Sequence, residues 1–169
     1  MLPSASRDHI RGSIDAPLAL IEYGDYECPY CGEAEPIVQA VRKLLGDRLC
    51  FAFRNFPLVN AHPHAEHAAE AAEAAGAQGH FWEMHDLLFE RQDALEDENL
   101  WKYALSLRLD ADRLMRDALS GAYAERLRED IQSGMRNGVH GTPSFFVNGI
   151  AFDEELNVEG LLAILAESS

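Results

Sequence analysis

Two cysteines, Cys28 and Cys31, lie close together near the start of the chain and are separated only by Pro29 and Tyr30. At this spacing the second thiol falls about one helical turn after the first, within reach of a disulfide. The same spacing supplies half of the ligands of a structural zinc site, and two buried cysteines can also be chemically inert. The pair therefore has three interpretations: a redox centre, a metal site or two packed thiols.

A zinc site would need further ligands. The chain offers Cys50 and the histidines of the segment HPHAEH, which are His62, His64 and His67. No second C-x-x-C pair is present in the sequence, however, and Cys50 lies within an apolar run. We therefore expect no metal at the pair, a buried thiol at Cys50 and a polar helix start at the histidines. The redox interpretation is preferred.

The cysteine pair lies between a predicted strand and a predicted helix. Residues 17–23 form a short apolar run without a helical period, which is typical of a buried strand. Apolar residues from 32 to 45 recur at helical spacing, and Gly46 is placed to end that helix. A second apolar run at 48–56 completes a strand–helix–strand unit, which implies parallel strands joined by a right-handed crossover.

The position of Cys28 at the junction of a strand and a helix favours its thiolate. Unpaired backbone N–H groups and the helix dipole stabilise a negative charge there. The neighbouring side chains oppose this effect, since no Lys or Arg occurs between positions 12 and 41 and four acids flank the pair: Asp25, Glu27, Glu33 and Glu35. We therefore predict a nucleophile less acidic than those of the strongest oxidants, whose thiol pKa is about 3.5.

The remainder of the chain is predicted to be mostly helical until two strands return near its end. Residues 64–135 carry apolar positions at helical spacing throughout. The segment 144–152 contains Asn148-Gly149 between two apolar runs, a strong signal for a hairpin with a type I′ turn. A last helix is expected at about 157–166. This order of elements predicts a mixed sheet, with parallel strands first and antiparallel strands at the end.

These features resemble the thioredoxin superfamily and, within it, the DsbA-like branch. The motif CPYC at 28–31 is a redox motif of the superfamily, and Pro36 lies where the family's active-site helix is kinked. Glu22 matches the position of the family's buried acid. The segment GTPSFFVNG at 141–149 matches the cis-proline loop, with Pro143 as its proline. The predicted helical insertion is a DsbA-like trait, so the resemblance covers nearly the whole chain.

The resemblance implies a role for each matching residue. Cys28 would be the nucleophile that forms a mixed disulfide, Cys31 would resolve it, and Glu22 would lie behind the pair and transfer protons. The resemblance also implies contacts with an extended substrate segment, and the residues expected to make them are Pro29, Tyr30, Thr142 and Pro143. Neither a metal nor an organic cofactor is implied.

The predicted fold is therefore an α/β thioredoxin fold. It has a mixed sheet, in the order β-α-β then β-β-α, with a helical insertion between the two halves. We expect residues 1–169 to form a single domain. Its thioredoxin-like core would occupy about 13–62 and 136–169, and the insertion about 63–135.

Composition and charge disfavour several other classes of protein. The formal net charge is -15, from 14 basic and 29 acidic residues, which argues against nucleic acid or an anionic membrane as a partner. No apolar run is long enough to cross a membrane, and the first residues, MLPSASRDHIRG, lack the apolar region of a signal peptide. We expect a monomeric, cytoplasmic protein without membrane contact. A mature periplasmic chain and a domain of a longer polypeptide are the alternatives.

The predicted function is thiol–disulfide exchange with dithiols or disulfides of proteins or peptides, together with a redox partner. One alternative is a zinc-stabilised binding module. Another is a glutathione-dependent transferase or isomerase on the same fold, which the two cysteines and their acidic surroundings disfavour. Oxidases, reductases and isomerases share this kind of site, and the reduction potential relative to that of the compartment decides among them.

Overall fold

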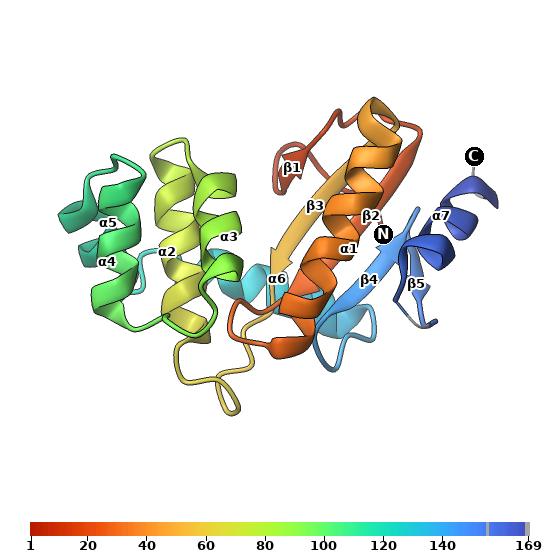
Figure 1. Cartoon of the computed structure of the whole chain (residues 1–169). Helices are drawn as coiled ribbons and strands as arrows, with labels where there is room; N and C mark the ends of the chain where they lie inside the picture. The colour runs from red at the N-terminus through yellow and green to blue at the C-terminus, as the bar shows by residue number, and fades with distance from the viewer. Residues whose placement is uncertain (155, 168–169) are drawn as a thin grey trace.

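The structure, a computed structural model, describes residues 1–154 and 156–167. Its centre is a five-stranded sheet in the order β1-β3-β2-β4-β5 (Figure 1). The strands are β1 (His9–Arg11), β2 (Leu18–Gly24), β3 (Leu49–Asn55), β4 (Ser144–Val147) and β5 (Ile150–Phe152). The α-helices are α1 (Pro29–Leu45), α2 (Ala65–Ala77), α3 (Phe81–Glu90), α4 (Asp97–Ser106), α5 (Ala111–Leu119), α6 (Ala124–Arg136) and α7 (Val158–Glu167). No helix in the described ranges is long and apolar enough to cross a membrane.

Helices cover both faces of the sheet. On β2, Leu18 and Leu20 join a cluster of buried side chains that includes residues of α1 and α7. The alternate residues Ile21 and Tyr23 join a second cluster, against which Ile131 of α6 packs. A strand that is covered on both faces is apolar along most of its length. This explains why the sequence of β2 shows no alternation of apolar and polar residues.

The predicted strand–helix–strand unit is present, with β2 and β3 parallel and α1 between them in the chain. Helix α1 begins at Pro29, earlier than predicted, because proline suits the first position of a helix. This early start makes Cys28 the N-cap residue and places Cys31 within the first turn. Pro36 lies inside the helix, and Gly46 ends it with a φ of 51°.

The predicted C-terminal hairpin is also present. Strand β4 pairs antiparallel with both β2 and β5, which makes the sheet mixed. Asn148 and Gly149 have φ values of 47° and 88°, and a type I′ turn requires positive φ at both positions. The Asn148 Oδ1 atom accepts a hydrogen bond from the N–H of Ala19 at 2.7 Å, which holds the turn against β2.

The sequence did not reveal β1. This strand has three residues and pairs antiparallel with the outer side of β3, where His9 lies opposite Phe53. Three residues are too few to show the alternation by which a strand is recognised. The sheet therefore includes residues before position 13, where the thioredoxin-like core was expected to begin.

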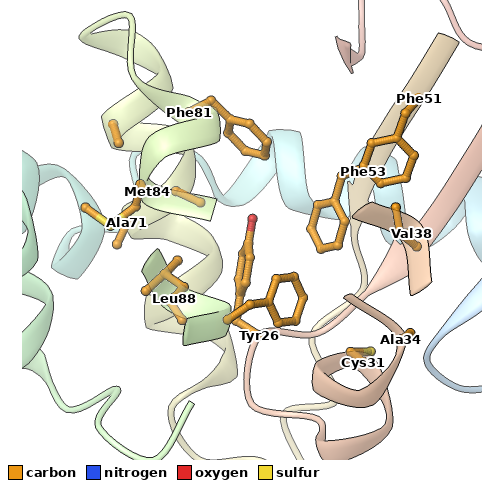
Figure 2. Packing of buried hydrophobic residues seen from close by; sticks show 14 of the residues in the cluster. Tyr26, Cys31, Ala34, Val38, Phe51, Phe53, Ala71, Phe81, Met84 and Leu88 are labelled. Carbon is orange, nitrogen blue, oxygen red and sulfur yellow. The ribbon is translucent and has the colours of Figure 1, made fainter. Parts of the chain in front are cut away.

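The segment between β3 and β4 forms helices α2 to α6, as predicted. Helix α2 contacts α3 and α5, and the small residues on its predicted packing face are all buried: Ala68, Ala71, Ala72 and Ala75. Figure 2 shows Tyr26 between Phe53 of β3 and the side chains of Met84 and Leu88 of α3. A continuous cluster of buried side chains thus joins the sheet to the inserted helices.

Candidate active site

The two cysteines lie at the N-terminal end of α1. Cys28 is the N-cap residue and is 3% exposed, whereas Cys31 is fully buried, and both are free thiols. The Cys31 sulfur accepts a hydrogen bond from the backbone N–H of Asp25 at 3.5 Å. The Cys28 sulfur lies 3.5 Å from the carbonyl oxygen of Thr142, in the loop before β4. Cys28 is therefore the outer thiol of the pair.

The surroundings drive the pKa values of the two thiols apart. A hydrogen bond from the Cys31 side chain, opposed by burial and assisted by backbone N–H groups, lowers the pKa of Cys28 to about 5. The hydrogen bond to Cys28, burial and the charge of Glu22 together raise the pKa of Cys31 far above its ordinary value. At neutral pH, Cys28 is therefore a thiolate and Cys31 a thiol, the states expected of a nucleophile and a resolving cysteine.

Two of the acids beside the pair, Asp25 and Glu27, accept hydrogen bonds from residues distant in the sequence, which the sequence did not reveal. Asp25 Oδ2 accepts hydrogen bonds from the Leu58 N–H at 2.8 Å and from His62 Nδ1 at 2.7 Å. Glu27 Oε2 accepts one from the N–H of His64 at 2.7 Å. Burial disfavours the charge on His62, but Asp25 outweighs it and raises the pKa of the imidazole. The pKa of about 5 for Cys28 lies above the value of about 3.5 found in the strongest oxidants.

Glu22 lies within β2 and is completely buried. Within the described part of the chain, neither of its carboxylate oxygens has a hydrogen-bond partner. Burial, with smaller contributions from the charges of Glu35 and Cys28, raises its pKa well above the ordinary value. The raised pKa favours the protonated form of Glu22. Its charge, when present, raises the pKa of Cys31. This coupling makes it suitable for exchanging a proton with the pair.

The loop before β4 presents backbone groups beside Cys28. The Thr142–Pro143 peptide bond is cis, as the resemblance implied. Pro143 has no N–H, so the Thr142 carbonyl is the backbone group that faces the sulfur. Between the two cysteines in the chain, Pro29 is exposed and Tyr30 is 69% exposed. Tyr26 is different, because it is buried and belongs to the core.

Gln92 is a further residue that the sequence did not point to. Gln92 follows α3 in the chain. Its side-chain amide donates hydrogen bonds to the carbonyl oxygens of Tyr26 and Cys28, each at 2.8 Å. Position 32 must be glycine for this arrangement, because a Cβ there would collide with the Gln92 amide. Gln92 thus fixes the turn that carries Cys28. It lies more than sixty positions from that turn and belongs to no recognisable motif, so no local signal could have identified it.

Among the described residues, those weighed as zinc ligands do not form a metal-binding cluster with the two cysteines. Cys50 is a buried thiol in β3, and His67 pairs with Asp97 at 2.7 Å. Across residues 1–154 and 156–167, the side chains that come close enough to share a metal ion are Glu35, His85 and Asp86. The prediction of a buried strand thiol at Cys50 agrees with its place in β3.

The fold and this site together define a protein of the thioredoxin class with a DsbA-like helical insertion. Several solved structures share the fold. BdbD from Bacillus subtilis in its oxidised form superposes with a TM-score of 0.88 at 22% identity, covering 99% of this chain and 95% of that one. A thioredoxin-like oxidoreductase from Silicibacter pomeroyi superposes with a TM-score of 0.85 at 23% identity, covering 96% of this chain and 92% of that one. Alpha-DsbA1 from Wolbachia pipientis superposes with a TM-score of 0.82 at 18% identity, covering 99% of this chain and 92% of that one.

The family model described as Thioredoxin matches residues 4–167, and the chain belongs to the thioredoxin family. The predicted fold and the resemblance to DsbA-like proteins are confirmed. Two similar curated proteins are named Na(+)/H(+) antiporters. One, from Salinispora tropica, is 48% identical over 159 residues, and another, from Salinispora arenicola, is 48% identical over 164 residues. The alignments cover 93% and 96% of this chain, but it spans only about a quarter of the length of these relatives.

Proposed function

We propose that this chain is a thiol–disulfide oxidoreductase that exchanges disulfides with proteins or peptides through Cys28 and Cys31. The observation that carries the proposal is the opposite shift of the two thiol pKa values, which the contact between the two side chains produces. Family membership and the DsbA-like fold support the same class of enzyme.

In the direction of substrate reduction, the Cys28 thiolate attacks one sulfur of a substrate disulfide. A mixed disulfide forms, and the other substrate sulfur leaves as a thiolate that takes a proton from water. Cys31 then loses its proton and attacks the Cys28 sulfur, which releases the second substrate sulfur and leaves a Cys28–Cys31 disulfide. Two electrons pass from the pair to the substrate. Oxidation of a substrate dithiol is the same sequence in reverse.

Cys31 needs a proton acceptor for the second step, because its pKa is raised far above neutral pH. When Cys28 forms a mixed disulfide, it loses the negative charge that contributes to the raised pKa of Glu22. Glu22 then ionises more readily and, in its ionised form, accepts the Cys31 proton. In the reverse direction the protonated acid returns that proton. Glu22 therefore acts as the general acid–base of the resolving step.

Thr142 and Pro143 bind the substrate segment next to the attacked disulfide. The Thr142 carbonyl, 3.5 Å from the Cys28 sulfur, accepts a backbone N–H of an extended peptide. Pro29 and the exposed Tyr30, which follow Cys28 in the chain, form an accessible rim beside the pair. A rim of this kind contacts many apolar side chains without selecting one, which suits a protein that acts on several substrates.

The proposal is tested by a redox titration in glutathione buffers, with alkylated cysteines counted by intact mass. We expect Cys28 and Cys31 to oxidise together while Cys50 remains a thiol. The matched control is Cys50→Ser, which should give the same midpoint, whereas Cys31→Ser should form only a mixed disulfide with glutathione. If no pair forms and the thiols react only after a chelator is added, the site binds metal and the proposal is wrong.

The glutathione-dependent alternative makes a different kinetic prediction. If the chain is not a glutathione enzyme, a neutral dithiol should reduce the Cys28–Cys31 disulfide faster than glutathione does. The cytoplasmic location, the monomeric state and the organisation as one domain remain predictions. Sedimentation of the reduced and oxidised protein tests the second of these.

A further inference from the structure

Three side chains beneath the cysteine pair direct polar atoms toward one another. Glu35 lies on α1, one turn after Cys31, and His85 and Asp86 lie on α3. Each offers one ligand atom, and these atoms lie within 4.8 Å of one another. His85 is completely buried, and its Nε2 is 3.7 Å from Glu35 Oε2, too far for a hydrogen bond.

One polar atom of each side chain makes no hydrogen bond with the described residues. Glu35 Oε2, His85 Nε2 and Asp86 Oδ1 are all buried, and none has a hydrogen-bond partner within residues 1–154 and 156–167. A buried polar atom without a partner costs about 1–3 kcal/mol. Three such atoms, on side chains whose ligand atoms lie within 4.8 Å of one another, indicate a site for a ligand that accepts electron pairs.

A second polar atom of each of the three side chains contacts a neighbouring residue. The holding contacts are Gln39 Nε2, 2.9 Å from Glu35 Oε1; the Tyr26 hydroxyl, 3.0 Å from His85 Nδ1; and the Arg11 guanidinium on Asp86 Oδ2. Metal ligands in proteins are commonly fixed in this way by a second layer of hydrogen bonds, which orients the coordinating atom. Here each of the three side chains keeps one buried atom without a hydrogen-bond partner among the described residues.

An ion can reach this point from solvent. A cavity of about 210 Å³ opens beside the cluster between α1 and α3, and Gln39 and Glu90 line it together with Glu35 and Asp86. The Asp86 side chain is 34% exposed. The cavity also leaves room for water molecules on the open side of a bound ion.

We propose that Glu35, His85 and Asp86 bind a divalent transition-metal ion, with Zn²⁺ as the probe. One imidazole nitrogen and two carboxylate oxygens, with an open position for water, form a donor set that Zn²⁺ accepts. The imidazole nitrogen disfavours Mg²⁺ and Ca²⁺, which prefer sites made of oxygen atoms alone. The ion joins α1, which carries the cysteines, to α3 of the helical insertion. This proposal is independent of the redox function.

The test is calorimetric titration of Zn²⁺ into the full chain with Cys28, Cys31 and Cys50 all changed to serine, so that no thiolate can bind the ion. We expect one ion per chain. In this background, Glu35→Gln and Asp86→Asn should each weaken binding by at least about tenfold, since even the loss of an outer partner costs about 10–100-fold. Glu90→Gln, in the same cavity, is the matched control and should bind as the parent does.

Two further measurements separate this site from its alternatives. Co²⁺ bound by the cysteine-free chain should show weak visible bands that Glu35→Gln abolishes, and Zn²⁺ should raise the melting temperature of the parent but not of Glu35→Gln. Circular dichroism checks that each variant is folded. Absence of saturable binding, or equal affinity in the parent and both carboxylate variants, would mean that these atoms hold only water, and the proposal would be overturned.

Discussion

The acidity of Cys28 can be tested by removing the side chain that lowers its pKa most. In the Cys31→Ala variant the thiol that hydrogen-bonds to the Cys28 sulfur is absent, while burial still disfavours the thiolate. We expect the pKa of Cys28 to rise from about 5 toward the ordinary value of 9.0. The contributions of backbone N–H groups remain, so the pKa should stop short of that value.

The magnitude at pH 7 follows from these pKa values. A thiol with a pKa of about 5 is about 99% ionised, whereas one with a pKa of 9.0 is about 1% ionised. The pKa of about 5 lies about two units below pH 7. This difference corresponds to about 2.7 kcal/mol in favour of the reduced pair, or about 60 mV in its reduction potential. The same effect stabilises the folded, reduced protein. It is fully present above pH 9.0, the unfolded pKa, and is lost as the pH falls through about 5.

The assay is the pH dependence of the rate at which iodoacetamide alkylates the reduced protein, with the modified cysteine identified by mass. The unaltered protein should show a midpoint near pH 5, and Cys31→Ala should show one at a clearly higher pH. Cys50→Ser serves as the control and should leave the midpoint unchanged. A midpoint above about pH 8 in the unaltered protein, or the same midpoint in both proteins, would refute the reasoning.

Three other variants test the surroundings of the pair. Glu22→Gln cannot accept a proton, so the mixed disulfide should resolve about 10²-fold more slowly, as measured by quenched-flow alkylation; an unchanged rate would exclude the proton-transfer role. Gln92→Ala removes two hydrogen bonds from the active-site turn and should lower the free energy of unfolding in urea by about 1–3 kcal/mol. His62→Ala removes stability that is fully present below pH 6.5 and lost as the pH rises through the raised pKa, so the difference in unfolding free energy from the unaltered protein should shrink in alkaline buffers.

Much of the fold could be predicted because its signals are local. The buried strands β2 and β3 are nearly continuous apolar runs, since helices cover both faces of the sheet. The type I′ turn was evident from Asn148-Gly149, because these residues adopt positive φ readily. The start of α1 was placed too late, since a proline at the first helical position carries no apolar signal. Strand β1 was missed because three residues cannot show a period.

The chemistry of the site was only partly accessible from the sequence. The positions of the cysteines, the buried acid and the proline loop follow from motifs. The partners of the flanking acids do not, because Asp25 and His62 are 37 positions apart and come together only when the chain folds. We expected repulsion by those acids to be the main effect that raises the pKa of Cys28. Burial is instead the main effect that raises it.

The two edges of the sheet are very short. β1 and β5 lie at its ends, and each has only three residues. An incoming strand would find few free backbone groups there, so the sheet is a poor template for aggregation or for permanent strand exchange between chains. If peptides bind at the loop before β4, as proposed, a few hydrogen bonds and one transient covalent bond retain them on this chain. Once that bond is resolved, little remains to retain the product, and turnover is favoured over tight capture.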